Sequence, residues 1–78
     1  MPTALNITGF RFSFFAADRH ELRHMHVRKS GKLAKYWLDP ISQEYNYGYA
    51  RSEIRQIEQL LEEHIDVLRR EWDTFCGS

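Results

Sequence analysis

The spacing of apolar residues changes once along the chain, and this change limits the folds that the sequence can adopt. In residues 9–15 every second position is a phenylalanine, which is the period of a half-buried strand. From about Arg51 onward, apolar residues instead recur three and four apart, as in an amphipathic helix. The helical set contains Ile54, Ile57, Leu61, Ile65, Leu68, Trp72 and Phe75. The sequence therefore predicts a helix over residues 51–75 that follows a β-sheet.

Two further strand-like segments, residues 23–28 and 33–38, flank a Ser30-Gly31 pair. Glycine accepts positive φ without steric cost, so this pair suits the two-residue turn of a β-hairpin. With Ser30 and Gly31 as the turn, residue 26 lies opposite residue 35 and residue 24 lies opposite residue 37. The third strand should end at Asp39-Pro40, because proline cannot donate a hydrogen bond to a neighbouring strand.

This register sorts the hairpin residues onto two faces, because successive side chains of a strand point to opposite sides. One face holds Met25, Val27, Ala34, Tyr36 and Leu38. The other face holds His24, His26, Arg28, Lys35 and Trp37. We expect the apolar face to form the core and the polar face to be a surface that can carry chemistry.

The expected fold class is α+β, with a small antiparallel sheet of three or four strands packed against one long C-terminal helix. The predicted strands span about residues 9–15, 23–28 and 33–38, and residues 43–49 form either a fourth strand or an ordered loop. A chain of 78 residues is long enough for a single domain over residues 1–78, and it buries only about 60% of its unfolded surface. A partner chain could bury more.

The charges balance, with 11 basic and 11 acidic residues, but they are unevenly distributed. The first half of the chain is basic and the helical half is acidic. The basic residues of the first half are Arg11, Arg19, Arg23, Arg28, Lys29, Lys32 and Lys35. Such a layout can attract an anion to one face, hold the two halves of the chain together, or drive association between copies.

Cys76 is the single cysteine, so no internal disulfide can form and a reducing compartment is expected. No run approaches the roughly 20 apolar residues of a membrane span, and the N-terminus lacks the pattern of a signal peptide. The sequence therefore predicts a cytoplasmic protein without a membrane partner.

Five segments, taken together, resemble a known family. They are Met1-Pro2-Thr3, Gly9–Phe12, His24–Lys29, Ala34–Pro40 and Glu53–Trp72. Their residues and mutual spacing resemble the small bacterial proteins called domain of unknown function 4160, over nearly the whole chain. The resemblance implies one component of a two-protein pair of the toxin–antitoxin kind. Family members commonly begin the helix with a serine, where this chain has Ala50 and therefore lacks one capping hydroxyl.

The His24-x-His26 pair is the first candidate for chemistry, because alternate residues of a strand project to the same side. Two imidazoles can share a metal ion or divide the roles of general acid and base. A zinc site needs three or four ligands, and the sequence fixes none of His20, Glu21 and His64 beside the pair. We therefore expect no metal and no cofactor. The structural alternative is a pair of half-exposed histidines packed beside Trp37.

The polar face contains the groups that a metal-independent endoribonuclease needs. In that hypothesis His24 and His26 transfer protons, and Lys35 stabilises the charge of the phosphorane. The candidates for binding nucleic acid or phosphate are Arg11, Arg28, Lys35 and Trp37, which offer positive charge and a ring for base stacking. The same residues fit RNA binding without cleavage, and an ordinary solvated sheet surface is the remaining alternative.

A helix over residues 51–75 would be about 35–40 Å long at about 1.5 Å per residue, longer than short strands can cover. Its end should overhang the sheet and leave Trp72 and Phe75 exposed, and exposed apolar patches usually mark interfaces. The predicted partner interface contains Ile65, Leu68, Trp72 and Phe75. The three tyrosines Tyr45, Tyr47 and Tyr49 either extend this interface or cap the edge of the sheet.

Two functional hypotheses follow. The first is a toxin-like component of a two-protein module that binds RNA, with cleavage through His24 and His26 as its catalytic form. The second is a non-catalytic interaction module whose helix and aromatic residues dock a partner, either a second small protein or a second copy of the chain.

Overall fold

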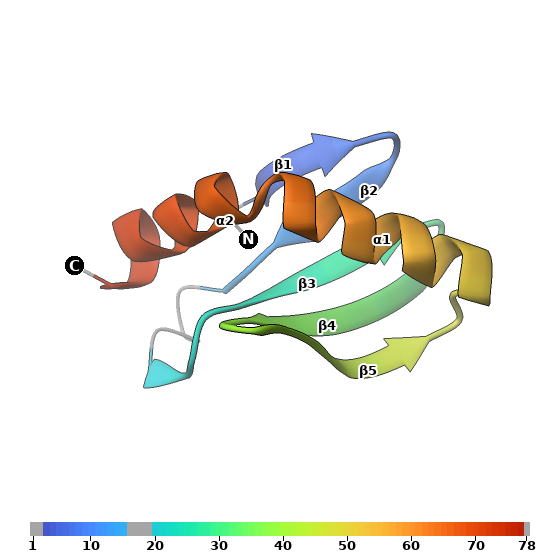
Figure 1. Ribbon diagram of the computed structural model, residues 1–78, viewed down its shortest axis with the longest axis horizontal. Helices are drawn as coiled ribbons and strands as arrows, with labels where there is room; N and C mark the ends of the chain where they lie inside the picture. The colour runs from blue at the N-terminus through green and yellow to red at the C-terminus, as the bar shows by residue number, and fades with distance from the viewer. Residues whose placement is uncertain (1–2, 16–19, 78) are drawn as a thin grey trace.

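The computed structural model describes residues 3–15 and 20–77, which form a five-stranded antiparallel sheet with helices on one face (Figure 1). The strands are β1 (Thr3–Ile7), β2 (Phe10–Ser13), β3 (His24–Lys29), β4 (Lys32–Leu38) and β5 (Ile41–Tyr47). They follow one another across the sheet in sequence order. The helical elements are α1 (Arg51–Glu63), α2 (Ile65–Trp72) and the π-helical segment η2 (Asp73–Gly77). The α+β class is therefore confirmed.

The sheet has more strands than the three or four predicted. In β1 only Leu5 and Ile7 carry the apolar alternation, which is too little to predict a strand from the sequence; pairing with β2 completes it. Residues 43–49, which the sequence left open between strand and loop, lie partly in β5. This strand starts at Ile41, directly after the Asp39-Pro40 turn.

The predicted β3–β4 hairpin is confirmed residue by residue, including His26 opposite Lys35 and His24 opposite Trp37. Its turn residues Ser30 and Gly31 have φ values of 50° and 79°, and positive φ at both positions is the requirement of a type I′ turn. This turn fixes the register, and the register fixes which side chains share a face.

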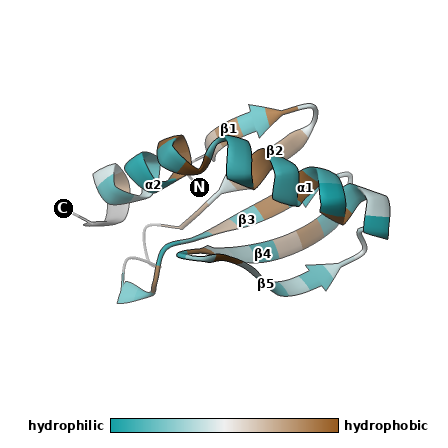
Figure 2. Ribbon diagram, viewed as in Figure 1, coloured by the Kyte–Doolittle hydropathy of each residue, from teal (hydrophilic) through white to brown (hydrophobic). Residues whose placement is uncertain are grey.

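The core lies between the sheet and the helices, where the inward residues of the strands meet the apolar stripe of α1 and α2. Its fully buried members include Phe10, Phe12, Phe14, Met25, Val27, Tyr36, Leu38, Ile57, Leu61 and Leu68. Hydrophilic and hydrophobic residues alternate along β3 in Figure 2, and along β4 buried residues alternate with half-buried ones from Leu33 onward, as expected for strands with one covered face. Burial raises the pKa of the Tyr36 phenol to about 12, and the phenol donates a hydrogen bond to Glu58 Oε2 at 3.0 Å.

The prediction of one uninterrupted helix is wrong, because the helix is divided at His64, whose φ and ψ are −115° and 18°. Helix α1 contacts β5, whereas α2 contacts β1 at the opposite edge of the sheet. The two segments thus cross the whole sheet, as Figure 1 shows. No glycine or proline marks this division in the sequence, so packing rather than backbone chemistry is the cause we infer.

Candidate functional site

The face of the sheet that points away from the helices, called the open face below, carries three rows of side chains. Residues opposite one another on neighbouring strands project to the same side, so the register defines these rows. The arginine row contains Asn6, Arg11, Arg28, Leu33 and Tyr47, one from each strand. The histidine row contains Ser13, His26, Lys35 and Tyr45. By register the tryptophan row contains His24, Trp37 and Ser42, although the ring of His24 is covered by Trp72 of α2 at the end of the sheet.

Arg11 and Arg28 lie directly opposite each other on β2 and β3, and both side chains are exposed. Within the part of the chain that the structure describes, neither guanidinium has a hydrogen bond or an ion pair. Like charges placed opposite each other destabilise a strand pair. An anion bound between the two guanidinium groups would relieve this repulsion.

The surface is hollowed on both sides of Arg28. A depression of about 280 Å³ is lined by Arg11, Arg28 and the turn between β3 and β4. A second depression, of about 200 Å³, is lined by Arg28, Lys32 and Leu33. Because both depressions include Arg28, the arginine row is recessed from β2 to β4.

The remaining basic side chains of the strands already have partners. Lys32 Nζ lies 2.8 Å from Glu53 Oε2, and Lys35 Nζ lies 3.2 Å from Glu21 Oε1. Lys29 Nζ donates to a carbonyl oxygen of the β1–β2 turn at 3.3 Å. Among the strand residues described, Arg11 and Arg28 are therefore the basic residues with no hydrogen-bond or ion-pair partner.

His24 is fully buried, so the predicted placement of this imidazole on an open surface is wrong. Its ring centroid lies 4.8 Å from that of Trp72, which reaches the start of β3 from the end of α2. Its Nδ1 lies 2.9 Å from the carbonyl oxygen of Leu22, and since a carbonyl only accepts, Nδ1 carries the proton of this bond. The contacts of His24 are those of a core residue.

His26 and Lys35 lie side by side in the histidine row, as the sequence predicts. The His26 ring is half-buried, with the ring of Phe15 at 5.2 Å and the Tyr45 hydroxyl 3.4 Å from Nδ1. The Lys35 side chain is only 15% exposed and is neutralised by Glu21. The structure thus brings the three proposed catalytic residues near one another but buries or pairs two of them.

Trp37 is half-buried rather than free to stack against a base. Its indole Nε1 donates to Glu44 Oε1 at 2.9 Å, and the Lys35 ammonium lies 4.7 Å from its ring centroid. The edge-on ring of His24 lies at 5.5 Å. These contacts on several sides give Trp37 a packing role at this end of the open face.

Tyr45 and Tyr47 of β5 form an aromatic pair that our sequence-based site lacked. Their rings are stacked, with centroids 4.7 Å apart and planes 22° apart. Tyr47 is 64% exposed, the most of any tyrosine described. The alternate tyrosines in the segment could have indicated this pair, because residues two apart on a strand share a face.

The predicted partner interface is mostly buried within the chain itself. Leu68 and Trp72 belong to the core and Ile65 packs against it, so only Phe75, at 57% exposure, stays open. The expected overhang of Trp72 is therefore wrong. The break at His64 turns α2 onto the end of the sheet, where Phe14 contacts the rings of both Trp72 and Phe75.

An ion-pair network holds α2 and η2 against the sheet. Arg23 Nε lies 2.7 Å from Asp39 Oδ2, and Arg23 Nη1 lies 3.0 Å from Asp73 Oδ2. Arg69 Nε lies 2.8 Å from the other oxygen of Asp39. The hydrogen bond to Asp39 is the main cause that raises the pKa of Arg23. These charges connect the turn between β4 and β5 with the C-terminal elements and are structural.

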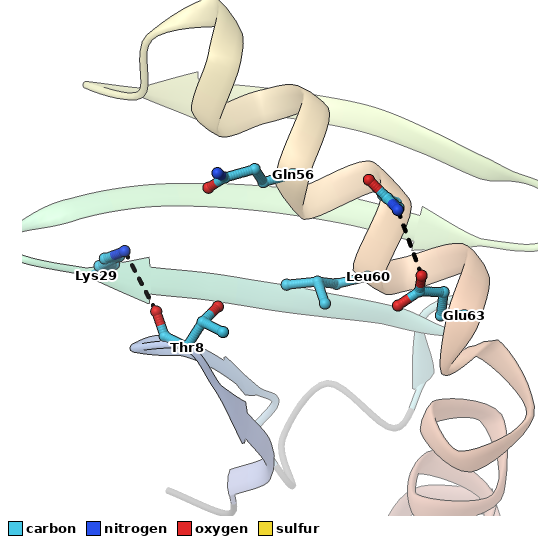
Figure 3. Close-up of a pocket in the computed structure, with 6 residues that line it drawn as sticks. Thr8, Lys29, Gln56, Leu60 and Glu63 are labelled. Atoms are coloured by element: carbon cyan, nitrogen blue, oxygen red, sulfur yellow. Dashed lines mark hydrogen bonds between the residues drawn. The ribbon is translucent and has the colours of Figure 1, made fainter.

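A separate hollow of about 360 Å³ lies on the helix side, between the β1–β2 turn and α1 (Figure 3). It is lined by Thr8, Lys29, Gln56, Gln59, Leu60 and Glu63. Its cation, Lys29, is bound to the turn, and Gln59 donates to Glu63 at 3.4 Å. Because these polar groups already bind one another, the hollow is less suited to a ligand than the arginine row is.

No three histidine, cysteine, aspartate or glutamate side chains of the described residues converge in the way that a metal site needs. Within residues 3–15 and 20–77, none of the helices has the length and apolar character required to cross a bilayer.

Comparison with known proteins identified a family. The family model described as "Domain of unknown function (DUF4160)" matches residues 9–73. The search of curated proteins and the search of solved structures found no match. The matched segment includes β2 to β5, α1 and α2, and so covers the open face and the helices behind it. The chain therefore belongs to the DUF4160 family.

Proposed function

We propose that this protein binds RNA through the open face of its sheet, with Arg11 and Arg28 as the phosphate-binding residues. The observation that carries the proposal is the direct opposition of two exposed guanidinium groups that have no acidic partner among residues 3–15 and 20–77. Arginine is suited to phosphate because its planar fork of donors can contact two oxygens at once. Two such forks beside a recessed surface favour a phosphodiester ligand.

The proposal is for binding rather than cleavage. A general base must reach the proton that it removes, and the imidazole of His24 has no exposed surface. Lys35 would first have to release Glu21. His26 alone cannot supply both a general base and a general acid in one step. RNA binding therefore needs fewer changes in the structure than RNA cleavage does.

The proposed cellular setting is a two-protein module of the toxin–antitoxin kind, which rests on the family resemblance alone. RNA binding is compatible with such a setting, in which the second protein would control access to the RNA. The alternative hypothesis is an interaction module that docks a partner through its helix and aromatic residues, and since Leu68 and Trp72 are buried, it would act through exposed rings such as that of Phe75.

The test is the affinity for a fluorescently labelled single-stranded RNA, measured by anisotropy at several salt concentrations from about 50 mM upward. We expect binding that weakens with salt, because phosphate contacts release counterions. Changing Arg11→Gln and Arg28→Gln together should reduce the slope of log K against log salt by about 1.4, at about 0.7 for each phosphate contact to a single strand.

Arg55→Gln is the matched control, because this arginine is exposed on α1, on the other side of the sheet. It should leave affinity and slope nearly unchanged. If the wild-type protein fails to bind RNA at low salt, or if the double variant binds as tightly as the wild type does, the proposed function is wrong.

A further inference from the structure

The arginine row does not end at Arg28 but continues to an exposed aromatic ring. Arg28 pairs with Leu33 on β4, and Leu33 pairs with Tyr47 on β5. Neighbouring strands are about 4.8 Å apart, so the backbones at Arg28 and Tyr47 are separated by about 10 Å. Positive charge and a stacking surface therefore lie within reach of one nucleotide.

Tyr47 is held in place before any ligand arrives. One side of its ring is stacked on Tyr45 at 4.7 Å, and the Tyr45 hydroxyl lies 3.4 Å from His26 Nδ1. Since Tyr47 is 64% exposed, its ring still offers surface to a planar ligand. A prearranged ring loses less conformational entropy on binding than a free one.

The surface between the charge and the ring also fits a nucleotide. Leu33 is half-buried there and offers an apolar floor, and the depression of about 200 Å³ extends from Arg28 to Leu33. Lys32, at the edge of this depression, is neutralised by Glu53. The positive charge is thus concentrated at the Arg11 and Arg28 end of the row, opposite the aromatic end.

We propose that Arg11, Arg28, Leu33 and Tyr47 form a site for one nucleotide of a single strand, an inference that rests on the proposed function. The phosphate lies against the two guanidinium groups, the ribose lies over Leu33, and the unpaired base stacks on Tyr47. A base inside a duplex is already stacked on its neighbours and cannot reach the tyrosine. Duplex RNA can therefore contact only the arginines.

The experiment compares three labelled ligands of about eight nucleotides in the same anisotropy assay. They are a single-stranded RNA, a strand of the same length with abasic sugars, and a blunt RNA duplex. We expect the intact strand to bind about 5- to 150-fold more tightly than the abasic strand, the range expected for stacking of one base. The duplex should bind no more tightly than the abasic strand does.

Two substitutions of Tyr47 assign this preference to the ring. Tyr47→Ala should remove the difference between the intact and abasic strands, whereas Tyr47→Phe should keep it, because the ring remains. Phe75→Ala is the matched control, since it removes another exposed aromatic side chain, from the C-terminal end of the chain. It should leave the preference unchanged.

The remaining outcomes distinguish a failure of the nucleotide site from a failure of the proposed function. If the intact strand, the abasic strand and the duplex bind equally and all lose affinity in Arg28→Gln, the arginines bind phosphate but the nucleotide site is wrong. If Tyr47→Ala keeps the preference for the intact strand, the base stacks elsewhere and the site is also wrong. If none of the three ligands binds at low salt, the proposed function itself fails.

Discussion

The imidazole of His24 and the indole of Trp72 pack against each other with ring centroids 4.8 Å apart, and this contact joins the start of β3 to the end of α2. Trp72 is 3% exposed and His24 is fully buried. The pair therefore closes the core at the end of β3 that lies away from the β3–β4 turn. Two residues that the sequence assigned to a catalytic site and to a partner interface stabilise the fold together.

Trp72→Ala should lower the free energy of unfolding by about 3–5 kcal/mol, the usual cost of removing a buried tryptophan side chain. The free energy of unfolding of a chain of this size is itself only about 4–12 kcal/mol, at about 0.05–0.15 kcal/mol per residue, so the variant should lose a large share of its stability and unfold at a much lower denaturant concentration. Chemical denaturation followed by circular dichroism measures the change. Phe75→Ala, at 57% exposure in the wild type, is the control and should cost about 1 kcal/mol or less. Equal losses in both variants would contradict the packing described for Trp72.

Arg11→Glu should stabilise the fold, because it replaces two opposed positive charges with an ion pair across β2 and β3. The expected gain is about 0.2–1 kcal/mol, and it should shrink with added salt. The reciprocal variant, Arg28→Glu, should give a similar gain in stability. The double variant should show no such gain, because two carboxylates then face each other. Additive gains in the double variant would show that the two side chains do not interact.

Tyr49→Phe should destabilise the protein by about 1 kcal/mol, because it removes a buried hydrogen bond from a side chain to the backbone of β3. The Tyr49 hydroxyl donates to the backbone oxygen of Val27 at 2.9 Å, and burial raises the pKa of this phenol to about 12. Denaturant titration at neutral pH measures the loss. Tyr47→Phe removes an exposed hydroxyl and should stay within about 0.5 kcal/mol of the wild type; a similar effect of both changes would contradict the role given to Tyr49.

Glu53→Gln should lower the melting temperature at neutral pH, and this decrease should become smaller at acidic pH. Glu53 accepts hydrogen bonds from Lys32 Nζ at 2.8 Å and from the Ala50 amide at 2.9 Å, and these bonds hold its pKa below the ordinary 4.5. A lowered pKa in the folded state stabilises the protein above the ordinary value, and that stabilisation is lost as the pH falls through the lowered value. Thermal melts from neutral pH downward should therefore converge for variant and wild type.

Glu62→Gln is the control for the acid experiment, because this carboxylate is exposed on the same helix and has no hydrogen bond or ion pair with the described residues. Its melting curves should follow those of the wild type at every pH. A constant difference between Glu53→Gln and wild type across the whole range would mean that the ionised carboxylate is not the stabilising species.

Much of the sheet could be predicted because its signals are local. The Ser30-Gly31 turn fixed the β3–β4 register, and the register fixed the side of the sheet to which Arg28 and Lys35 project. The alternation around Arg11 placed this residue on the same side. β1 escaped prediction because five residues with two inward apolar side chains carry too little pattern, and pairing with β2 decides their conformation.

The candidate site could be predicted only in part. The alternation of a strand gives the side of the sheet to which a side chain projects, but it does not give how exposed that side chain is. Arg11 was a candidate to join Arg28 from the neighbouring strand, and the two lie opposite each other on β2 and β3, while the accessible ring in their row is Tyr47 rather than Trp37. Lys35 was placed on the correct face, but its charge is compensated by Glu21, a residue 14 positions earlier in the chain. Ion pairs between distant residues leave no pattern in a single sequence.

The sequence by itself determined the two periods of the chain, the hairpin register and the side of the sheet that carries its basic residues, since each depends on neighbours a few positions apart. The tertiary structure decided the division of the helix at His64, the burial of His24 beneath Trp72, and which arginines of the described strands have no hydrogen-bond or ion-pair partner. These features depend on contacts between residues up to about 50 positions apart, as between Arg23 and Asp73, and such contacts exist only once the chain has packed.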